Sequence, residues 1–422
     1  MKKILFTIQW YPAKDSANVL CDDKVIQELL KTGNYEIHCL VYRPNGLAKF
    51  EILNGVRIHR FSRGLYFKYY LWARKNKSKI GTAINRIILR IKQILTIPIY
   101  PCYEPLATLK YAKEAKKLHK KEKFDIVISE HHGFDTLYAG HALKKYDANI
   151  KFIPILWDPF TGKEPAKYLP KGYAEKKLLH SERKILSIAD CIIAMRSSEE
   201  YHKKMSINKA YYDKYRFLDI PGIIKPKEAK VDAKFIDENK INIVYSGVLS
   251  LPERDPSYIV KLLNQTKYAK NLNLVFLAIG NGVDKLYGLK EKFSGNLVIN
   301  GYVSREEINA IYHKSDVLLN LGGSNPYMVP SKIFEYMSYG KSILSTYYID
   351  DESSKKYFDK YPLALCIDER KDKDKNKAIL EDFIGSKLNE RIEFEDVKKA
   401  FPLNLPESYV QVIDDVLRSR NE

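Results

Sequence analysis

The chain has 422 residues and a formal net charge of +19, and 45% of its residues are hydrophobic. This composition excludes an intrinsically disordered chain, and the length indicates two or three domains. The five cysteines are scattered without a CxxC pair, which argues against structural zinc or a disulfide framework and favours a reduced, cytoplasmic protein. No apolar run approaches the ~20 residues that a membrane-spanning helix requires.

Strand-like apolar segments alternate with helical segments in the first half of the chain. Strands are predicted at 3–8, 35–42, 125–129, 151–156 and 190–195, with helices at 22–31 and 175–189. No GxGxxG follows the first strand, so the dinucleotide-binding fingerprint is absent there. Strands separated by helices predict a parallel, doubly wound sheet of the α/β class.

A basic segment interrupts this alternation. Residues 63–121 contain fifteen Lys or Arg and only two acids, and apolar residues from Ile84 to Leu95 recur at helical spacing with Arg86 and Arg90 on the opposite face. The pattern fits either a helix on an anionic membrane surface or a helix packed on a sheet with a solvated outer face. Nucleic acid would also attract this charge, but no nucleic-acid-binding motif is present, so we expect no such partner.

The stretch 221–240 is polar, lysine-rich and punctuated by prolines, and the alternation restarts after it. We therefore place a first domain at 1–225 with a basic insert near 65–104, a linker at 226–240, and a second domain at 241–400. The expected elements of the second domain are strands at 241–246, 273–279, 296–299, 317–320 and 342–346 and helices at 257–265 and 305–314. A final helix within 401–422 is expected to cross back to the first domain.

One loop of the second half contains residues suited to an anion. The segment SGVLSLPERDPS has Ser246 and Gly247 at the end of a strand and Arg254 in the loop. A glycine allows a ligand to approach the backbone, and an arginine can bind phosphate through two hydrogen bonds. Such residues are common in loops, so this signal is weak by itself.

The segment NPYMVPSKIFEYMSYGKSIL is a short helix between Pro330 and Gly340, and we expect a left-handed conformation at Gly340. Ser331 and Glu335 share one face of this helix. The spacing does not fit a capping box. The acid is either a surface residue favoured by the helix dipole or a ligand-binding residue, with the N–H groups near Ser331 and Lys332 holding a diphosphate.

These segments carry a resemblance to a known family. The motifs YSGVLSLPERDP, AIGNG, NGYVSREEINAIYHKSDVLLN and PSKIFEYMSYGKSIL resemble the nucleotide-sugar-binding domain of family-4-like glycosyltransferases of the GT-B fold, as found in bacterial surface-polysaccharide synthesis. The segments MKKILFTIQWYP, FDIVISEHH and ADCIIAMRSS are similar to the acceptor domain of the same family. The resemblance implies two Rossmann-like domains that face a cleft.

The resemblance also implies roles for particular residues. Glu335 would bind the ribose of the donor, and the backbone near Ser331 and Lys332 would contact its diphosphate. The other positions implied at the donor are Ser246, Gly247, Arg254, Gly280, Tyr302 and Val303. Many members have a further glutamate eight positions before Glu335, close to the transferred sugar, where this chain has Tyr327.

Three residues of the first half are catalytic candidates. Family members often place a histidine of the loop SEHHGFD against the donor sugar, and His131 or His132 would fill that role here. The alternative is a pair of solvated loop histidines. Asp158 follows another strand and would contact the acceptor, or it would form an Asp-Pro turn.

The resemblance implies transfer of a sugar from a nucleotide-diphosphate sugar to a glycan or lipid-linked glycan, with retention of configuration and without a metal or other cofactor. Membrane association at the inner face of the cell membrane would suit a lipid-linked acceptor. The alternatives are a sugar-nucleotide epimerase or hydrolase of the same fold, or a non-catalytic binding or scaffold protein.

Overall fold

The structure is a computed structural model that describes residues 1–12, 17–44, 46–76, 78–131, 133–159, 168–324, 326 and 329–419. The chain forms two compact units. Unit 1 comprises Met1–Ile220 and Pro406–Glu422, and unit 2 comprises Pro221–Leu405. The stretch 221–240, expected to be a linker or the end of the first domain, is thus grouped with unit 2.

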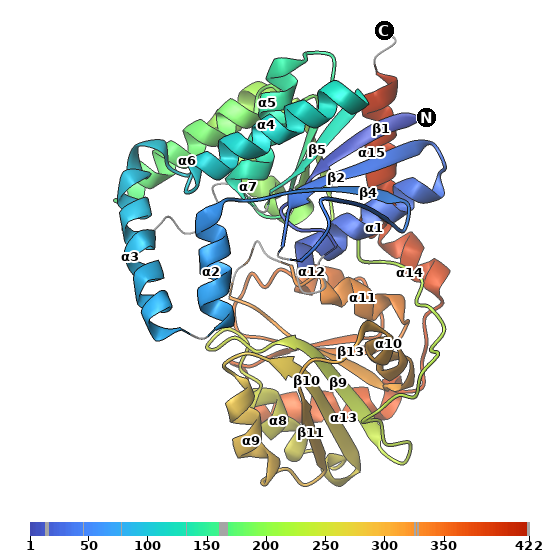
Figure 1. The fold of residues 1–422 in the computed structure, drawn as a ribbon. Coiled ribbons are helices and arrows are strands. Elements are labelled where there is room, and N and C mark those ends of the chain that lie inside the picture. Colours follow the sequence, from blue (N-terminus) through green and yellow to red (C-terminus); the bar gives the residue numbers. More distant parts are fainter. Residues whose placement is uncertain are drawn as a thin grey trace. The chain divides into compact units, whose positions relative to one another are not determined.

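Unit 1 is built on an eight-stranded sheet in the order β3-β4-β2-β1-β5-β6-β7-β8. Figure 1 labels its strands β1, β2, β4 and β5. Its strands pair in parallel except for β3, which is antiparallel to β4. Their bounds are β1 Lys2–Thr7, β2 Tyr35–Tyr42, β3 Phe50–Leu53, β4 Val56–Phe61, β5 Ile126–Glu130, β6 Lys151–Leu156, β7 Ile192–Met195 and β8 Tyr215–Leu218. β5 and β7 are buried throughout and the other inner strands are mostly buried, as expected for a parallel sheet with helices on both faces.

The helices of unit 1 include one from the end of the chain. They are α1 Ala17–Lys31, α2 Leu65–Lys75, α3 Lys79–Leu95, α4 Pro105–Glu122, α5 Phe134–Tyr146, α6 Lys171–Leu186, α7 Glu199–Lys204 and α15 Pro406–Arg418, with short 3-10 turns at Ile97–Ile99, Arg196–Ser198 and Ser206–Lys214. On α15, Tyr409 is fully buried, packs against Trp157 and donates a hydrogen bond to the carbonyl of Asp219 at 2.8 Å. These contacts attach α15 to unit 1.

Unit 2 contains a six-stranded parallel sheet in the order β11-β10-β9-β12-β13-β14. Its strands are β9 Ile241–Val248, β10 Leu272–Ile279, β11 Asn296–Asn300, β12 Val317–Leu321, β13 Ser342–Tyr347 and β14 Ala364–Asp368. Its helices are α8 Ser257–Asn264, α9 Val283–Lys290, α10 Arg305–Lys314, α11 Lys332–Ser338, α12 Lys355–Phe358, α13 Lys373–Lys387 and α14 Phe394–Ala400, with 3-10 turns at Ala269–Asn271 and Pro402–Asn404. The predicted α/β class with two Rossmann-like domains is confirmed.

Each sheet has a point where the strand order reverses, next to the first strand of its unit. In unit 1, β1 pairs with β2 on one side and with β5 on the other. In unit 2, β9 pairs with β10 on one side and with β12 on the other. Doubly wound sheets bind ligands at the carboxyl ends of the strands beside such a switch point. Ligand-binding residues are therefore expected in the loops after β1, β5, β9 and β12.

The predicted helical repeat of the basic segment forms α3, which stands beside α2 as an antiparallel pair (Figure 1). Within the described residues, no helix is long and apolar enough to span a membrane.

Candidate functional site

A partly buried lysine contact lies at the switch point of unit 2. Ser246 is near the end of β9, and its side-chain oxygen lies 2.9 Å from the ammonium of Lys332, the first residue of α11. The same ammonium lies 3.2 Å from the hydroxyl of Tyr312 on α10. The structure thus brings two predicted donor-site residues together and places a positive charge at the carboxyl edge of β9.

Glu335, the residue predicted to bind the donor ribose, faces this lysine from the next turn of α11. One carboxylate oxygen lies 4.0 Å from the ammonium of Lys332, and the other lies 2.8 Å from the guanidinium of Arg305 at the start of α10. Burial and the charge of Glu335 raise the pKa of Tyr312, so this phenol stays protonated at neutral pH. Arg305 was not predicted as a site residue, although its position right after the NGYVS motif is a usable signal.

The helix that carries these residues has the predicted ends. Ser331 is its N-cap residue and makes no side-chain capping hydrogen bond, which agrees with the missing capping box. Gly340 follows the C-cap residue with φ of 63°, so the predicted left-handed conformation is confirmed. A Cβ at Gly340 would meet the carbonyl oxygen of Ile392 at 2.0 Å, so both conformation and space require glycine.

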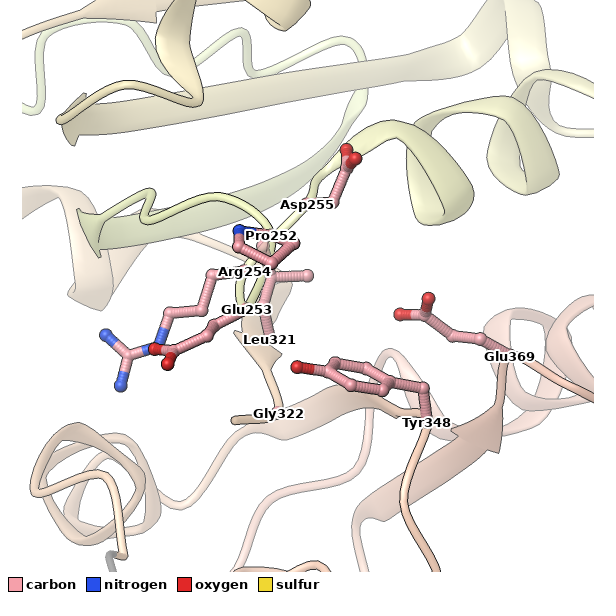
Figure 2. Close-up of a pocket in the computed structure, with 8 residues that line it drawn as sticks. All are labelled: Pro252, Glu253, Arg254, Asp255, Leu321, Gly322, Tyr348 and Glu369. Atoms are coloured by element: carbon pink, nitrogen blue, oxygen red, sulfur yellow. The ribbon is translucent and has the colours of Figure 1, made fainter. Parts of the chain in front are cut away.

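Arg254 lies in a pocket of about 160 Å³ beyond the same strand ends (Figure 2). The pocket is lined by the loop after β9, by the last residue of β12 and by the residues directly after β12, β13 and β14, namely Pro252, Glu253, Arg254, Asp255, Leu321, Gly322, Tyr348 and Glu369. Figure 2 shows Arg254 and Glu253 extending to one side and Tyr348 and Glu369 on the other. Sequence reasoning missed Tyr348 and Glu369, although each directly follows a strand.

The pocket combines one cation with several acids. Burial raises the pKa of Glu369. Burial also acts to raise the pKa of Asp255, but its ion pair with Lys285 and hydrogen bonds from Ser257 bring that pKa below its ordinary value. Carboxylates and a phenol bind hydroxyl groups, whereas a guanidinium binds phosphate. The lining therefore suits a ligand with both hydroxyl and phosphate groups.

No protein-family model matches the chain, and no curated protein matches its sequence. Solved structures match it over nearly all of both chains. The trehalose-6-phosphate synthase OtsA has a TM-score of 0.64 at 15% identity, with 99% of each chain covered. The UDP-forming α,α-trehalose-phosphate synthase of Burkholderia xenovorans, in complex with glucose-6-phosphate, has a TM-score of 0.63 at 12% identity, with 99% of this chain and all of that one covered.

HepE from Anabaena, in complex with UDP-glucose, has a TM-score of 0.59 at 12% identity, over 99% of this chain and all of that one. The chain has the GT-B fold. At these identities the likeness establishes the fold alone.

In this GT-B fold, the four remaining donor-site predictions lie on β9 and on two loops of unit 2. Gly280 has φ of 112°, and a Cβ there would meet the carbonyl oxygen of Leu249 at 2.3 Å, so the close approach of two loops already explains this glycine. Gly247 follows Ser246 on β9. Tyr302 is exposed and Val303 is buried, directly before the capping box that begins α10.

The catalytic candidates of unit 1 follow β5 and β6. His131 is buried, and its Nδ1 lies 3.3 Å from the carbonyl oxygen of Asp158, so the structure brings these two residues together. The interpretation of His131 as a solvated loop histidine was wrong, because its backbone N–H bonds to Ile155 and draws the residue against β6. His132 and Tyr327 lie outside the described residues.

Unit 1 also has a buried carboxylate that sequence reasoning passed over. Asp135, at the start of α5, accepts hydrogen bonds from the Gln9 amide at 2.8 Å, from the Tyr42 hydroxyl and from the Thr136 N–H at 3.1 Å. These donors come from the ends of β1 and β2 and from α5. Asp135 thus fixes the loops at the switch point of unit 1, and its place at the end of SEHHGFD is the signal that was available.

One group of side chains in the described residues has the composition of a metal site. Glu36, His38 and Glu122 offer ligand atoms within 4.8 Å of one another. They lie at the amino ends of β1 and β2, away from the switch point. Lys3 already pairs with both glutamates, at 3.5 and 3.2 Å, and Arg57 pairs with Glu36 at 3.4 Å. Because cations already neutralise these acids, we assign no metal to this group.

Proposed function

We propose that this protein is a glycosyltransferase that transfers a sugar from a nucleotide-diphosphate sugar to a glycan or lipid-linked glycan. The observation that carries the proposal is the contact of Lys332 with Ser246, with Glu335 one turn away, at the switch point of a GT-B fold. This arrangement offers a cation for a diphosphate and a carboxylate for a diol on neighbouring turns of one helix.

In this proposal the diphosphate is bound near Lys332 and the N–H groups at Ser331, and Arg254 adds a second cation. Charge that develops on the leaving diphosphate is then stabilised by residues of the protein, which needs no metal. Glu335 accepts hydrogen bonds from the ribose hydroxyls, and the loop with Tyr302 and Val303 borders the base. That HepE was solved with UDP-glucose supports a nucleotide sugar as the donor.

The remaining parts of the proposal rest on the sequence. His131, His132 and Asp158 would act on the transferred sugar and the acceptor, and we propose retention of configuration. The five free cysteines favour a cytoplasmic protein, in line with an acceptor at the inner face of the cell membrane.

The test is the affinity of the Glu335→Ala variant for UDP and UDP-sugars, measured by calorimetry. We expect a loss of about 10- to 100-fold, since hydrogen bonds to a charged group contribute about 1.5–3 kcal/mol. The exposed Glu291 provides a control, because Glu291→Ala removes the same charge from another part of unit 2. Unchanged affinity of Glu335→Ala would rule out the ribose role.

Loss of the Arg305 ion pair is a competing explanation for any effect at Glu335. Arg305→Ala removes that pair and leaves the carboxylate in place. If Glu335 binds ribose directly, Arg305→Ala keeps most of the affinity. If both variants lose affinity equally, the pair acts by holding α10 against α11. Product analysis with and without a glycan acceptor separates transfer from hydrolysis or epimerisation.

A further inference from the structure

The apolar row of α3 faces solvent. Its residues Ile80, Ile84, Ile87, Ile91, Ile94 and Leu95 recur at helical spacing, and they are 42–76% exposed. A helix on the surface of a globular protein normally turns such a row toward the core. The interpretation of this segment as a helix packed through its apolar face on a sheet was therefore wrong. We call these six residues the outer row of α3.

Small and polar residues form the face of α3 that packs on the protein. Gly81 and Asn85 are buried, and a Cβ on Gly81 would lie 2.8 Å from that of Ala73, so α2 and α3 approach closely there. Further along, the Lys92 ammonium lies 3.4 Å from the centre of the Tyr66 ring and 3.4 Å from the Glu104 carboxylate. These contacts fix the rotation of α3 with its outer row away from the rest of unit 1.

Glu104 connects this hairpin to the rest of unit 1. Its carboxylate also accepts a hydrogen bond from the side chain of Arg63 at 2.7 Å, and the Arg63 guanidinium lies over the Tyr42 ring of β2. The orientation of the outer row is therefore supported from the sheet through Arg63, Glu104 and Lys92. It is a property of the fold rather than of a loosely attached helix.

The charges around the outer row indicate what covers it. Arg90 lies three residues after Ile87 and four before Ile94, so it borders the row instead of lying opposite it as the sequence had suggested. On α2, Trp72 is more than half exposed. An apolar helix face bordered by a cation, on a helix packed beside one that carries an exposed tryptophan, is typical of helices in the headgroup region of anionic bilayers. A second copy of the chain on this face would bring two basic segments together, and their like charges would repel each other.

We propose that the α2–α3 hairpin docks on an anionic membrane surface, with the outer row of α3 inserted among the lipids. This proposal names the part of the protein that would bind the membrane in which a lipid-linked acceptor of the proposed function is held. It does not depend on glycosyl transfer, because the hairpin lies in unit 1 and the proposed donor site lies in unit 2. The two can therefore fail separately.

The test is flotation of the full chain with vesicles of phosphatidylcholine and phosphatidylglycerol, compared with phosphatidylcholine alone. We expect binding to the anionic vesicles that weakens with salt, because part of the attraction is electrostatic. The variant Ile87→Glu/Ile91→Glu should bind at least about 30-fold more weakly, since it places charge in the inserted row. The exposed Ile379 on α13 supplies the control Ile379→Glu, which should bind like the unchanged protein.

Because these side chains are exposed, the variants should keep the thermal stability and the UDP affinity of the unchanged protein. Equal vesicle binding by the unchanged protein and by Ile87→Glu/Ile91→Glu would overturn the proposal. So would equal binding to neutral and anionic vesicles. Sedimentation provides another decisive measurement: a dimer that the double variant dissociates, without vesicle binding, would assign the outer row to a second copy. If the unchanged protein binds the anionic vesicles but does not bind UDP, the result contradicts the proposed function and leaves the membrane proposal intact.

Discussion

Units 1 and 2 share one architecture and differ in the side chains at the same edge of their sheets. In unit 2, this edge holds two partly exposed cations, Arg254 in the loop after β9 and Lys332 at the start of α11, and their neighbours include acids. In unit 1, the corresponding edge holds buried groups fixed by internal hydrogen bonds, such as Asp135 and His131. The shared fold fixes where a ligand would bind, and the loops decide which ligand.

The difference extends to ionisation. Burial, with the charge of Glu130 next, raises the pKa of Asp22 in unit 1. The same unit holds the buried histidines His141 and His202, whose pKa values burial lowers to about 4. Eight of the nine histidines precede unit 2, whose sequence contains only His313. We therefore expect unit 2 to bind anionic ligands and unit 1 to lose stability in acid.

The largest expected effect is a selective loss of stability of unit 1 in acid. His141 and His202 have folded pKa values of about 4 and ordinary values of 6.5, so the unfolded state binds more protons between these limits. Their contribution is complete above pH 6.5 and is lost as the pH falls toward 4. At full protonation of both states the loss is roughly 3 kcal/mol for each histidine, partly offset by Asp22. Hydrogen exchange of peptides from both units, measured from pH 6.5 to pH 4, reports this loss of stability in unit 1 and its absence in unit 2.

The variant His202→Phe isolates one histidine. Its ring lies among Tyr201, Tyr215 and Phe217, so an aromatic replacement suits the site. The acid transition of unit 1 should move to lower pH in this variant and stay unchanged in His313→Phe. An unchanged transition in His202→Phe would show that another group controls it.

A second effect should be confined to unit 2. Lys332→Met removes the ammonium that contacts Ser246 and Tyr312 but keeps much of the stem. We expect the affinity for UDP to fall about 100-fold, because charge-assisted hydrogen bonds to a diphosphate are lost. Calorimetry measures it, with Lys261→Met on the exposed face of α8 as control. Equal affinities of the two variants would remove the cation from the proposed donor site.

Most of the fold could be predicted because it follows from buried strands and helix ends. The apolar runs of β2 and β6 begin and end at the predicted residues, since buried parallel strands read as continuous apolar segments. The hairpin of β3 and β4 was missed, although VRIHRF alternates between apolar and polar residues, because its two strands are only four and six residues long. The rotation of α3 could not be predicted, because its apolar row fits a buried helix and a membrane-bound helix equally well.

The candidate site was predictable where one helix or strand holds its residues. Glu335 and Lys332 share α11, and the motif PSKIFEYM locates both. The partners that complete the site come from elements distant in sequence. Arg305 reaches Glu335 from α10, and Glu369 enters the Arg254 pocket from the end of β14. These residues lie close together because of the order of the strands in the sheet, which the sequence alone does not reveal.

The smallest expected effect concerns Arg254. It shares its pocket with Glu253, Asp255 and Glu369, so its positive charge is partly neutralised before any ligand binds. Arg254→Gln should therefore weaken UDP binding by about tenfold, less than Lys332→Met, because the remaining acids repel a diphosphate but the stronger contact stays. Calorimetry on both variants gives the ranking. The opposite ranking would place the diphosphate in the Arg254 pocket and leave Lys332 with a structural role between β9 and α11.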